Sequence, residues 1–184
     1  MLSGFDPLRP ELSDAGALLL ALGRESSPAE LDAIAPWRLR APLSPDMAAA
    51  REGRRIDFAE LVGFTRRLTS TDSCATLIEG VGGVMAPLDE QHTVRDWIAA
   101  SGLPCVVVTG SYLGSLSHTL TALEALTRVG AGVTAIAVNE TPGSAVALDA
   151  TVESLSRHAA GIPVVAIARA DLRAGVTRLA GLLS

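Results

Sequence analysis

Short apolar runs alternate with helical segments through the second half of this chain, and this alternation is the strongest constraint on its fold. Helical spacing is clearest in Leu116, Leu120, Leu123 and Leu126, a segment that ends at Gly130. The predicted strands are Cys74–Glu79, Pro104–Thr109, Val133–Val138 and Ile162–Ile167, and the helices that follow them are 94–101, Leu116–Val129, Asp149–Ala159 and Leu172–Leu183. Continuously apolar strands, each followed by a helix, predict a parallel α/β sheet with helices on both faces.

The first half of the chain differs, because it contains helix signals but no convincing strand before residue 74. The predicted helices are Ser13–Leu22, a segment opened by Ser27-Pro28, Asp46–Glu52, and one from Asp57 to about Thr69. A doubly wound domain normally begins with a strand whose following turn holds phosphate. We therefore predict a single domain over residues 1–184, a doubly wound α/β sheet that opens without the usual first strand.

Composition narrows the class of protein. Hydrophobic residues make up 48% of the chain and charged residues 19%, which is typical of a globular protein. The formal net charge is -5 with no basic patch, so nucleic acid is not an expected partner. Residues Met1–Pro10 lack the apolar core of a signal peptide, and no stretch reaches the roughly 20 apolar residues of a membrane span. The predicted location is the cytoplasm.

The sequence contains no lysine, since all 15 basic residues are arginine. The common phosphate-binding loop, G-x-x-x-x-G-K-[ST], uses its lysine to contact the β- and γ-phosphates. These 184 residues therefore contain no ordinary loop of this kind.

The segment Ile78–Gly83 contains the first candidate site. Glu79 ends a predicted strand, where open α/β sheets bind ligands, and a carboxylate there can hold Mg²⁺ beside phosphates. Gly80, Val81 and Gly82 follow, and glycines let the backbone approach a ligand closely. A plain connection between strand and helix is the alternative interpretation.

A second candidate site opens the helix after the Pro104–Thr109 strand. Free backbone amides at Gly114, Ser115 and Leu116 would bind a phosphate or a carboxylate at the positive end of the helix dipole. The alternative is that Ser115 or Ser117 simply caps this helix.

Two weaker candidates depend on their positions. Asn139 and Glu140 follow the Val133–Val138 strand on the ligand side, and an amide there can recognise an adenine edge, although Asn is also a common turn residue. Asp14 stands at a helix start, where simple N-capping is the alternative to ligand binding.

Taken together, these segments resemble the dethiobiotin synthetase family in that family's order. The matching segments are Ile78–Gly83 with Pro87-Leu88, Gly102-Leu103-Pro104, Leu113–Leu120, Asn139, Ala41–Pro45 and Glu52-Gly53-Arg54. Each is common alone, but the combination is specific and spans nearly the whole chain. The resemblance implies an enzyme of biotin synthesis that closes a cyclic urea on 7,8-diaminopelargonate with CO₂ and ATP.

The resemblance also implies roles for individual residues. Asp14 and Glu79 correspond to carboxylates beside Mg²⁺ and the phosphates, and Gly80–Gly82 corresponds to part of the nucleotide loop. Ser3 corresponds to a substrate contact, as do Gly114, Ser115 and Leu116. Asn139, followed by Glu140, corresponds to the residue that recognises adenine. The family also implies a P-loop NTPase-like fold, of which the first βαβ unit is missing here, and a homodimer.

The chain departs from this family in one important respect. The family's pattern begins with a strand, a lysine-containing P-loop, a helix, and a second strand that ends in a lysine-proline pair. Both lysines are absent here, so we assign no catalytic residue and expect the short chain to be inactive. The alternatives are a true start codon upstream of Met1, a non-catalytic binding relative, a split enzyme whose partner supplies the P-loop, and another ligase of the P-loop class.

Overall fold

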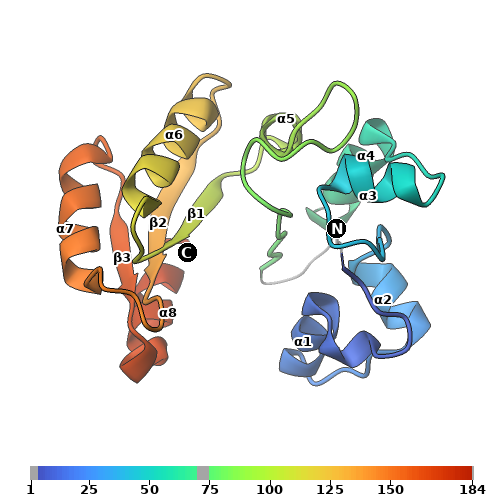
Figure 1. Ribbon diagram of the computed structural model, residues 1–184, viewed down its shortest axis with the longest axis horizontal. Coiled ribbons are helices and arrows are strands. Elements are labelled where there is room, and N and C mark those ends of the chain that lie inside the picture. The colour runs from blue at the N-terminus through green and yellow to red at the C-terminus, as the bar shows by residue number, and fades with distance from the viewer. Residues whose placement is uncertain (1–3, 70–74, 184) are drawn as a thin grey trace. The chain divides into compact units, whose positions relative to one another are not determined.

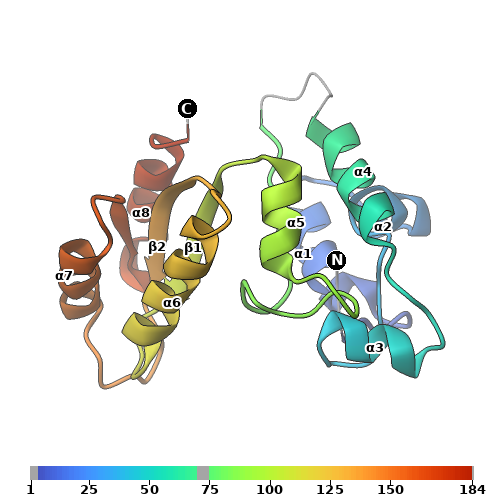
Figure 2. The same ribbon diagram turned by 90° about the horizontal axis from the view of Figure 1, so that it is seen from above.

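The computed structural model describes residues 4–69 and 75–183. The chain divides into two compact units, Met1–Ser101 and Gly102–Ser184, called unit 1 and unit 2 below. Helices make up the regular structure of unit 1, and a small parallel sheet with its helices makes up unit 2 (Figures 1 and 2).

The helices of unit 1 are those that its sequence predicts. After a short 3₁₀ turn at Pro10–Leu12, the helices are α1 (Asp14–Ala21), α2 (Pro28–Ile34), α3 (Pro45–Arg51), α4 (Phe58–Thr69) and α5 (Val94–Ser101). Their N-terminal signals are local. Ser13 and Ser27 cap α1 and α2 through the amides of Gly16 and Glu30, and Asp57 accepts from the amide of Glu60 at α4.

Two separate apolar clusters stabilise unit 1. Ala15 and Leu19 of α1 pack with Leu31 and Ala35 in one cluster. The other, larger cluster joins α3, α4 and α5, and includes Trp37, Leu39, Ala48, Ala49, Ile56, Leu61, Val62, Leu88, Val94 and Trp97. Trp97 Nε1 donates a buried hydrogen bond of 2.9 Å to Thr65 Oγ1, which fixes α5 on α4.

Unit 2 contains a three-stranded parallel sheet in the order β1-β2-β3. Its elements are β1 (Cys105–Gly110), α6 (Ser115–Thr127), β2 (Val133–Asn139), α7 (Leu148–His158), β3 (Val164–Ile167), a 3₁₀ turn at Arg169–Asp171 and α8 (Leu172–Ala180). In the register of the sheet, Asn139 of β2 pairs with Gly110 on one side and with Ile167 on the other. The carboxyl ends of all three strands therefore lie at the same end of the sheet.

Helices cover both faces of this sheet, as predicted. Leu123 of α6 and Leu155 of α7 pack with Ile136 and Val138 on one face. On the other face, Leu179 of α8 packs with Ala137, Val165 and Ile167 (Figure 2). The approach of α8 is close at Gly175, where a Cβ atom would lie 2.7 Å from the carbonyl oxygen of Ala166.

Within the described chain, β1 and β3 each pair only with β2, so each has an unpaired edge. Val106 packs on the α8 face with Ala137. Val108 lies on the same face by alternation but is 63% exposed. An apolar, exposed edge strand of this kind favours addition of another strand.

Residues 75–79 correct one prediction, because they form no strand and Leu77 is 87% exposed. Cys74, where the predicted strand begins, lies outside the described residues. A parallel strand needs a hydrogen-bonding neighbour, and no strand of the described chain pairs with this segment. The order β1-β2-β3 also contains no reversal of strand order, so the doubly wound arrangement stays a prediction.

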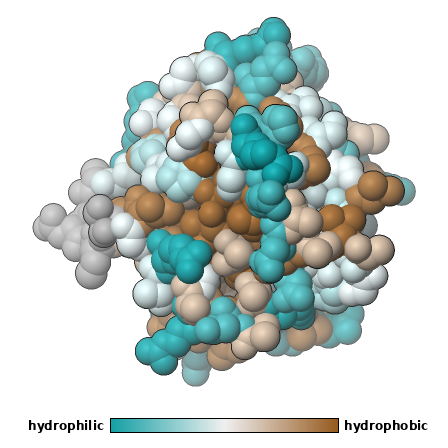
Figure 3. All heavy atoms as spheres, turned by 90° about the vertical axis from the view of Figure 1, so that its left-hand side faces the viewer, coloured by the Kyte–Doolittle hydropathy of each residue, from teal (hydrophilic) through white to brown (hydrophobic). Residues whose placement is uncertain are grey.

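Apolar side chains remain at the surface of unit 2. A groove with a volume of about 550 Å³ is lined by Leu120, Leu123, Glu124, Thr127, Arg128, His158, Ala159, Ala160 and Ile162, from α6, α7 and the turn after α7. Figure 3 shows apolar residues interspersed with polar ones on the face that it displays. Among the helices described, none is both long and apolar enough to cross a bilayer.

Candidate functional site

The N-terminus of α6 has the properties of an anion site. Gly114 is the N-cap with a φ of 98°, and no side chain caps the helix, so capping by Ser115 or Ser117 is wrong. Within the described residues, the backbone amides of Leu116 and Ser117 have no hydrogen-bond acceptor. Two free amides at the positive end of a 13-residue helix attract a carboxylate or a phosphate.

Ser115 adds an unpartnered hydroxyl to this helix start. The side chain is buried, and its Oγ has no hydrogen-bond partner among the described residues. An unsatisfied buried hydroxyl is unfavourable in an empty site. The prediction of a free Ser115 amide is wrong, because that amide donates to the carbonyl of Tyr112 over 3.0 Å. Ser115 therefore offers its hydroxyl, and Leu116 offers its amide while its side chain is partly exposed.

Hydrogen bonds hold the strand-to-helix loop before α6 in place. Ser111 donates its amide to the carbonyl of Asn139 over 3.0 Å, and its Oγ accepts from the amide of Thr141, also over 3.0 Å. Thr119 Oγ1 lies 2.7 Å from the carbonyl of Ser115 and 2.9 Å from Thr109 Oγ1. The first turn of α6 is thereby attached to the ends of β1 and β2.

Asn139 and Glu140 lie at this same carboxyl end of the unit 2 sheet. The side chain of Asn139 is exposed and makes no hydrogen bond to a described residue, so it is free to contact a ligand. Glu140 differs, because its Oε2 accepts from the amide of Arg169 over 2.8 Å. That bond ties the loop after β2 to the loop after β3, which gives Glu140 a structural role.

The two candidate carboxylates of unit 1, those of Asp14 and Glu79, belong to different segments of the chain. Asp14 is the first residue of α1, and Ser13 is the N-cap, so the alternative that Asp14 caps the helix is wrong. The α1 cluster is separate from the cluster against which Val81 packs. Glu79 follows residues 75–78, which form no strand, and its carboxylate, like that of Asp14, is exposed and contacts no described residue through a hydrogen bond or an ion pair.

The glycine loop, residues Glu79–Gly83, is supported from its C-terminal side. A Cβ atom on Gly80 would lie 3.2 Å from Val94 Cγ1, and Gly82 has a φ of 67°. The amide of Arg95 donates to the carbonyl of Val84 over 2.7 Å, and that of Val94 to Ala86 over 3.0 Å. The loop therefore rests on the start of α5.

The candidate metal ligands are two exposed carboxylates, those of Asp14 and Glu79. Within residues 4–69 and 75–183, no group of three or more His, Cys, Asp or Glu side chains could hold a metal ion. Mg²⁺ is commonly held by one or two carboxylates together with phosphates and water. Exposed, unengaged carboxylates at Asp14 and Glu79 fit that mode of binding. Ser3 lies outside the described residues.

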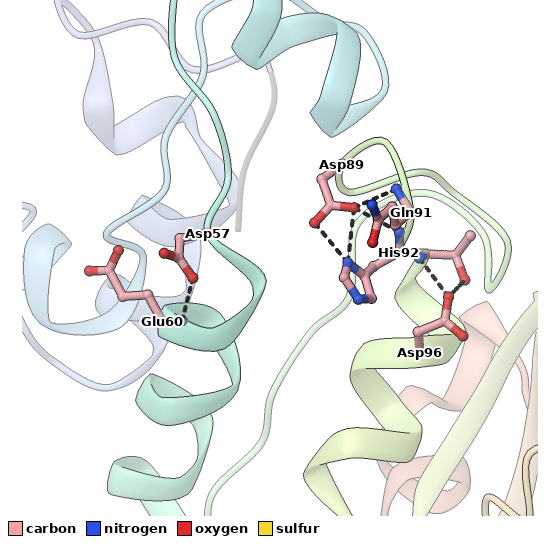
Figure 4. A network of polar contacts seen from close by, with 7 residues as sticks. Asp57, Glu60, Asp89, Gln91, His92 and Asp96 are labelled. Atoms are coloured by element: carbon pink, nitrogen blue, oxygen red, sulfur yellow. Dashed lines mark hydrogen bonds and ion pairs between the residues drawn. The ribbon is translucent and has the colours of Figure 1, made fainter.

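Sequence reasoning missed several contacts that shape these loops. Tyr112 Oη lies 3.4 Å from His118 Nδ1 beside the α6 start. Asp89 and His92 form a polar pair after the glycine loop (Figure 4). Their only signal in the sequence is a polar residue near a turn, which is too common to be diagnostic.

Comparison with known proteins identifies the family. The family described as an AAA domain matches residues 17–170. The ATP-dependent dethiobiotin synthetase BioD of Acidiphilium cryptum is 49% identical over 162 residues, which cover 88% of this chain and 73% of that protein. The enzymes of the same name from Methylobacterium nodulans and Phenylobacterium zucineum are 43% and 44% identical, over 85% and 92% of this chain and 70% and 73% of those proteins. With this identity over most of its length, the chain belongs to the dethiobiotin synthetase family of ATP-dependent ligases.

Proposed function

We propose that this chain carries the substrate-binding part of a dethiobiotin synthetase, which closes a cyclic urea on 7,8-diaminopelargonate with CO₂ and ATP. One amine of the substrate is carbamylated, the carbamate takes the γ-phosphoryl group, and the second amine then displaces phosphate. The observation that carries the proposal is the start of α6, where the amides of Leu116 and Ser117 and the buried Oγ of Ser115 lack partners in the described chain. These groups match the terminal carboxylate of the substrate.

The proposed nucleotide contacts are those that the family resemblance implies. Asn139 recognises adenine through its free amide, and Glu140 holds that loop by its bond to the Arg169 amide. The loop Gly80–Gly82 approaches the phosphates, and Asp14 and Glu79 hold Mg²⁺. When bound, the ion neutralises charge that develops on the transferred phosphoryl group. Ser3 is a proposed substrate contact.

The phosphate-binding lysine has to come from outside these 184 residues, because they contain no lysine. The unpaired edge of β1 and the exposed Val108 favour an added strand at that position. The P-loop strand of the family, encoded upstream or supplied by a split partner, would fit at this edge. We also propose that residues 1–184 form a single domain, that the protein is a homodimer and that it is located in the cytoplasm. A non-catalytic binding relative is the alternative.

Calorimetry with the purified chain tests the proposal. We expect 7,8-diaminopelargonate to bind without nucleotide, and ATP to bind weakly because the P-loop lysine is absent. Ser115→Ala should weaken diaminopelargonate binding about fivefold to tenfold, by loss of one hydrogen bond of about 1 kcal/mol. The same change should not lower stability, since the hydroxyl has no partner in the described chain.

Thr121→Ala is the matched control, because Thr121 Oγ1 bonds to the carbonyl of Ser117 on the exposed side of the same helix. This variant should bind diaminopelargonate like the unchanged chain. Equal binding by the Ser115→Ala and unchanged chains would remove the α6 site from the proposal. Micromolar ATP affinity would contradict the expected dependence on a lysine from elsewhere.

A further inference from the structure

A turn directly after the glycine loop is organised by one carboxylate. Asp89 Oδ1 accepts from the amides of Gln91 and His92 over 2.8 and 2.7 Å. His92 Nδ1 lies 2.9 Å from Asp89 Oδ2 (Figure 4). Desolvation raises the pKa of Asp89, but the hydrogen bonds from Gln91 and His92 outweigh it and leave that pKa below its ordinary value. The turn is therefore a closed polar unit centred on an ionised Asp89.

The imidazole of His92 also attaches this turn to α4. It stacks on Phe58, the first residue of α4, with the ring centroids 3.9 Å apart and the planes 3° from parallel. Phe58 in turn packs against the larger apolar cluster of unit 1. His92 is thus held on one side by a carboxylate and on the other by an aromatic ring.

His92 is connected to the glycine loop through Val94, which lies two residues further along the chain. Val94 donates its amide to Ala86 and places Cγ1 against Gly80. The carbonyl of His92 also accepts from the amide of Leu88 over 2.8 Å, which pairs the two arms of the turn. A displacement of His92 would therefore move Val94, on which the glycine loop rests.

The charged groups around His92 are mostly acidic. Asp57 and Glu60 lie at the start of α4 (Figure 4). Glu90 in the turn lies 3.8 Å from Arg55, and Arg95 pairs with Asp96 at the start of α5. From α3, the backbone amide of Asp46 donates to the carbonyl of Pro87. A proton on His92 would face Asp89 directly, and no described basic side chain lies between them.

We propose that His92 is a positioning residue that sets the conformation of the glycine loop Glu79–Gly83 through Asp89 and Phe58. The proposal deepens the proposed function, on which the loop's role with nucleotide rests. His92 itself does not contact the ligand. It acts through Val94 and through the paired arms of the turn.

Hydrogen exchange and backbone relaxation of the ligand-free chain test this role. In His92→Ala, the protection of the Val94 and Arg95 amides should fall about tenfold, as expected from loss of a hydrogen bond to a charged group of about 1.5 kcal/mol. The order parameters of Gly80 and Gly82 should fall as well. His92→Asn keeps a donor for Asp89 and His92→Phe keeps the stack on Phe58, so each should restore part of the effect.

Comparison of the two units separates positioning from general stability. In His92→Ala the loss of protection should be confined to Val94, Arg95 and their neighbours, and the amides of β2 in unit 2 should keep their protection. Unchanged protection in His92→Ala, or an equal loss at β2 of unit 2 and at α5, would overturn the proposal. No ligand is added, so either outcome leaves the test of diaminopelargonate binding independent.

Discussion

The two candidate ligand segments, one in each unit, differ in what supports them. The loop from Gly110 to Leu116 in unit 2 follows a paired strand, opens a 13-residue helix and is tied to β2 through Ser111. The glycine loop in unit 1 follows a segment that pairs with no described strand, and the backbone hydrogen bonds of Val94 and Arg95 support it from its C-terminal side, at the start of α5. The difference shows that a paired strand holds the start of the unit 2 loop, a support that the glycine loop receives from no described strand.

The largest expected effect tests whether the sheet of unit 2 and the segment before the glycine loop differ in their packing. Ile136→Ala in β2 removes a fully buried side chain from the centre of the sheet and should lower the free energy of unfolding by about 2–5 kcal/mol. Leu77→Ala, in the segment predicted as a strand, should change it by less than about 0.5 kcal/mol, because Leu77 is 87% exposed. Urea denaturation followed by circular dichroism measures both. A large loss in Leu77→Ala would mean that this segment is packed as a strand.

A smaller effect tests the attachment of the unit 2 loop. Ser111→Ala leaves the amide of Thr141 without its acceptor and should cost about 1–3 kcal/mol. Ser144→Ala is the control, since Ser144 Oγ accepts only from the nearby amide of Val146 in a local turn. Thermal unfolding of the two variants gives the difference. Equal stability would show that the sheet, rather than this bond, holds the loop.

The smallest expected effect is the response of unit 1 to acid. Hydrogen bonds lower the pKa of Asp89, as described, and at Asp96 hydrogen bonds from Thr93 and Arg95 outweigh desolvation and also lower the pKa. A carboxyl whose folded pKa is lowered stabilises the fold above its unfolded pKa of about 3.9, and the contribution is lost as the pH falls through the folded value. Unit 1 should therefore loosen below about pH 4 before unit 2 does.

Hydrogen exchange read separately for α5 and β2 measures this order of acid loosening. Asp96→Asn should reduce the pH dependence at α5 while β2 stays unchanged. Simultaneous loosening of the two units would show that other carboxyl groups dominate the acid response.

Local signals explain which parts of the fold could be predicted. Ser13, Ser27 and Asp57 cap their helices through amides only three residues away, and Gly130, the predicted end of the helix that begins at Leu116, has a positive φ. The Pro104–Thr109, Val133–Val138 and Ile162–Ile167 strands are confirmed within a few residues. The Cys74–Glu79 strand is wrong for the described residues 75–79, because strand formation depends on a distant partner and not on local composition.

The sequence alone determined the family and the approximate positions of the helices, since both follow from the order and type of neighbouring residues. Tertiary structure decided which side chains are engaged. Among the described residues it left Ser115 Oγ buried without a partner, bonded Glu140 to the Arg169 amide and placed His92 between Asp89 and Phe58. These outcomes depend on residues brought together by packing or by the exact course of a turn, and residue type alone specifies neither.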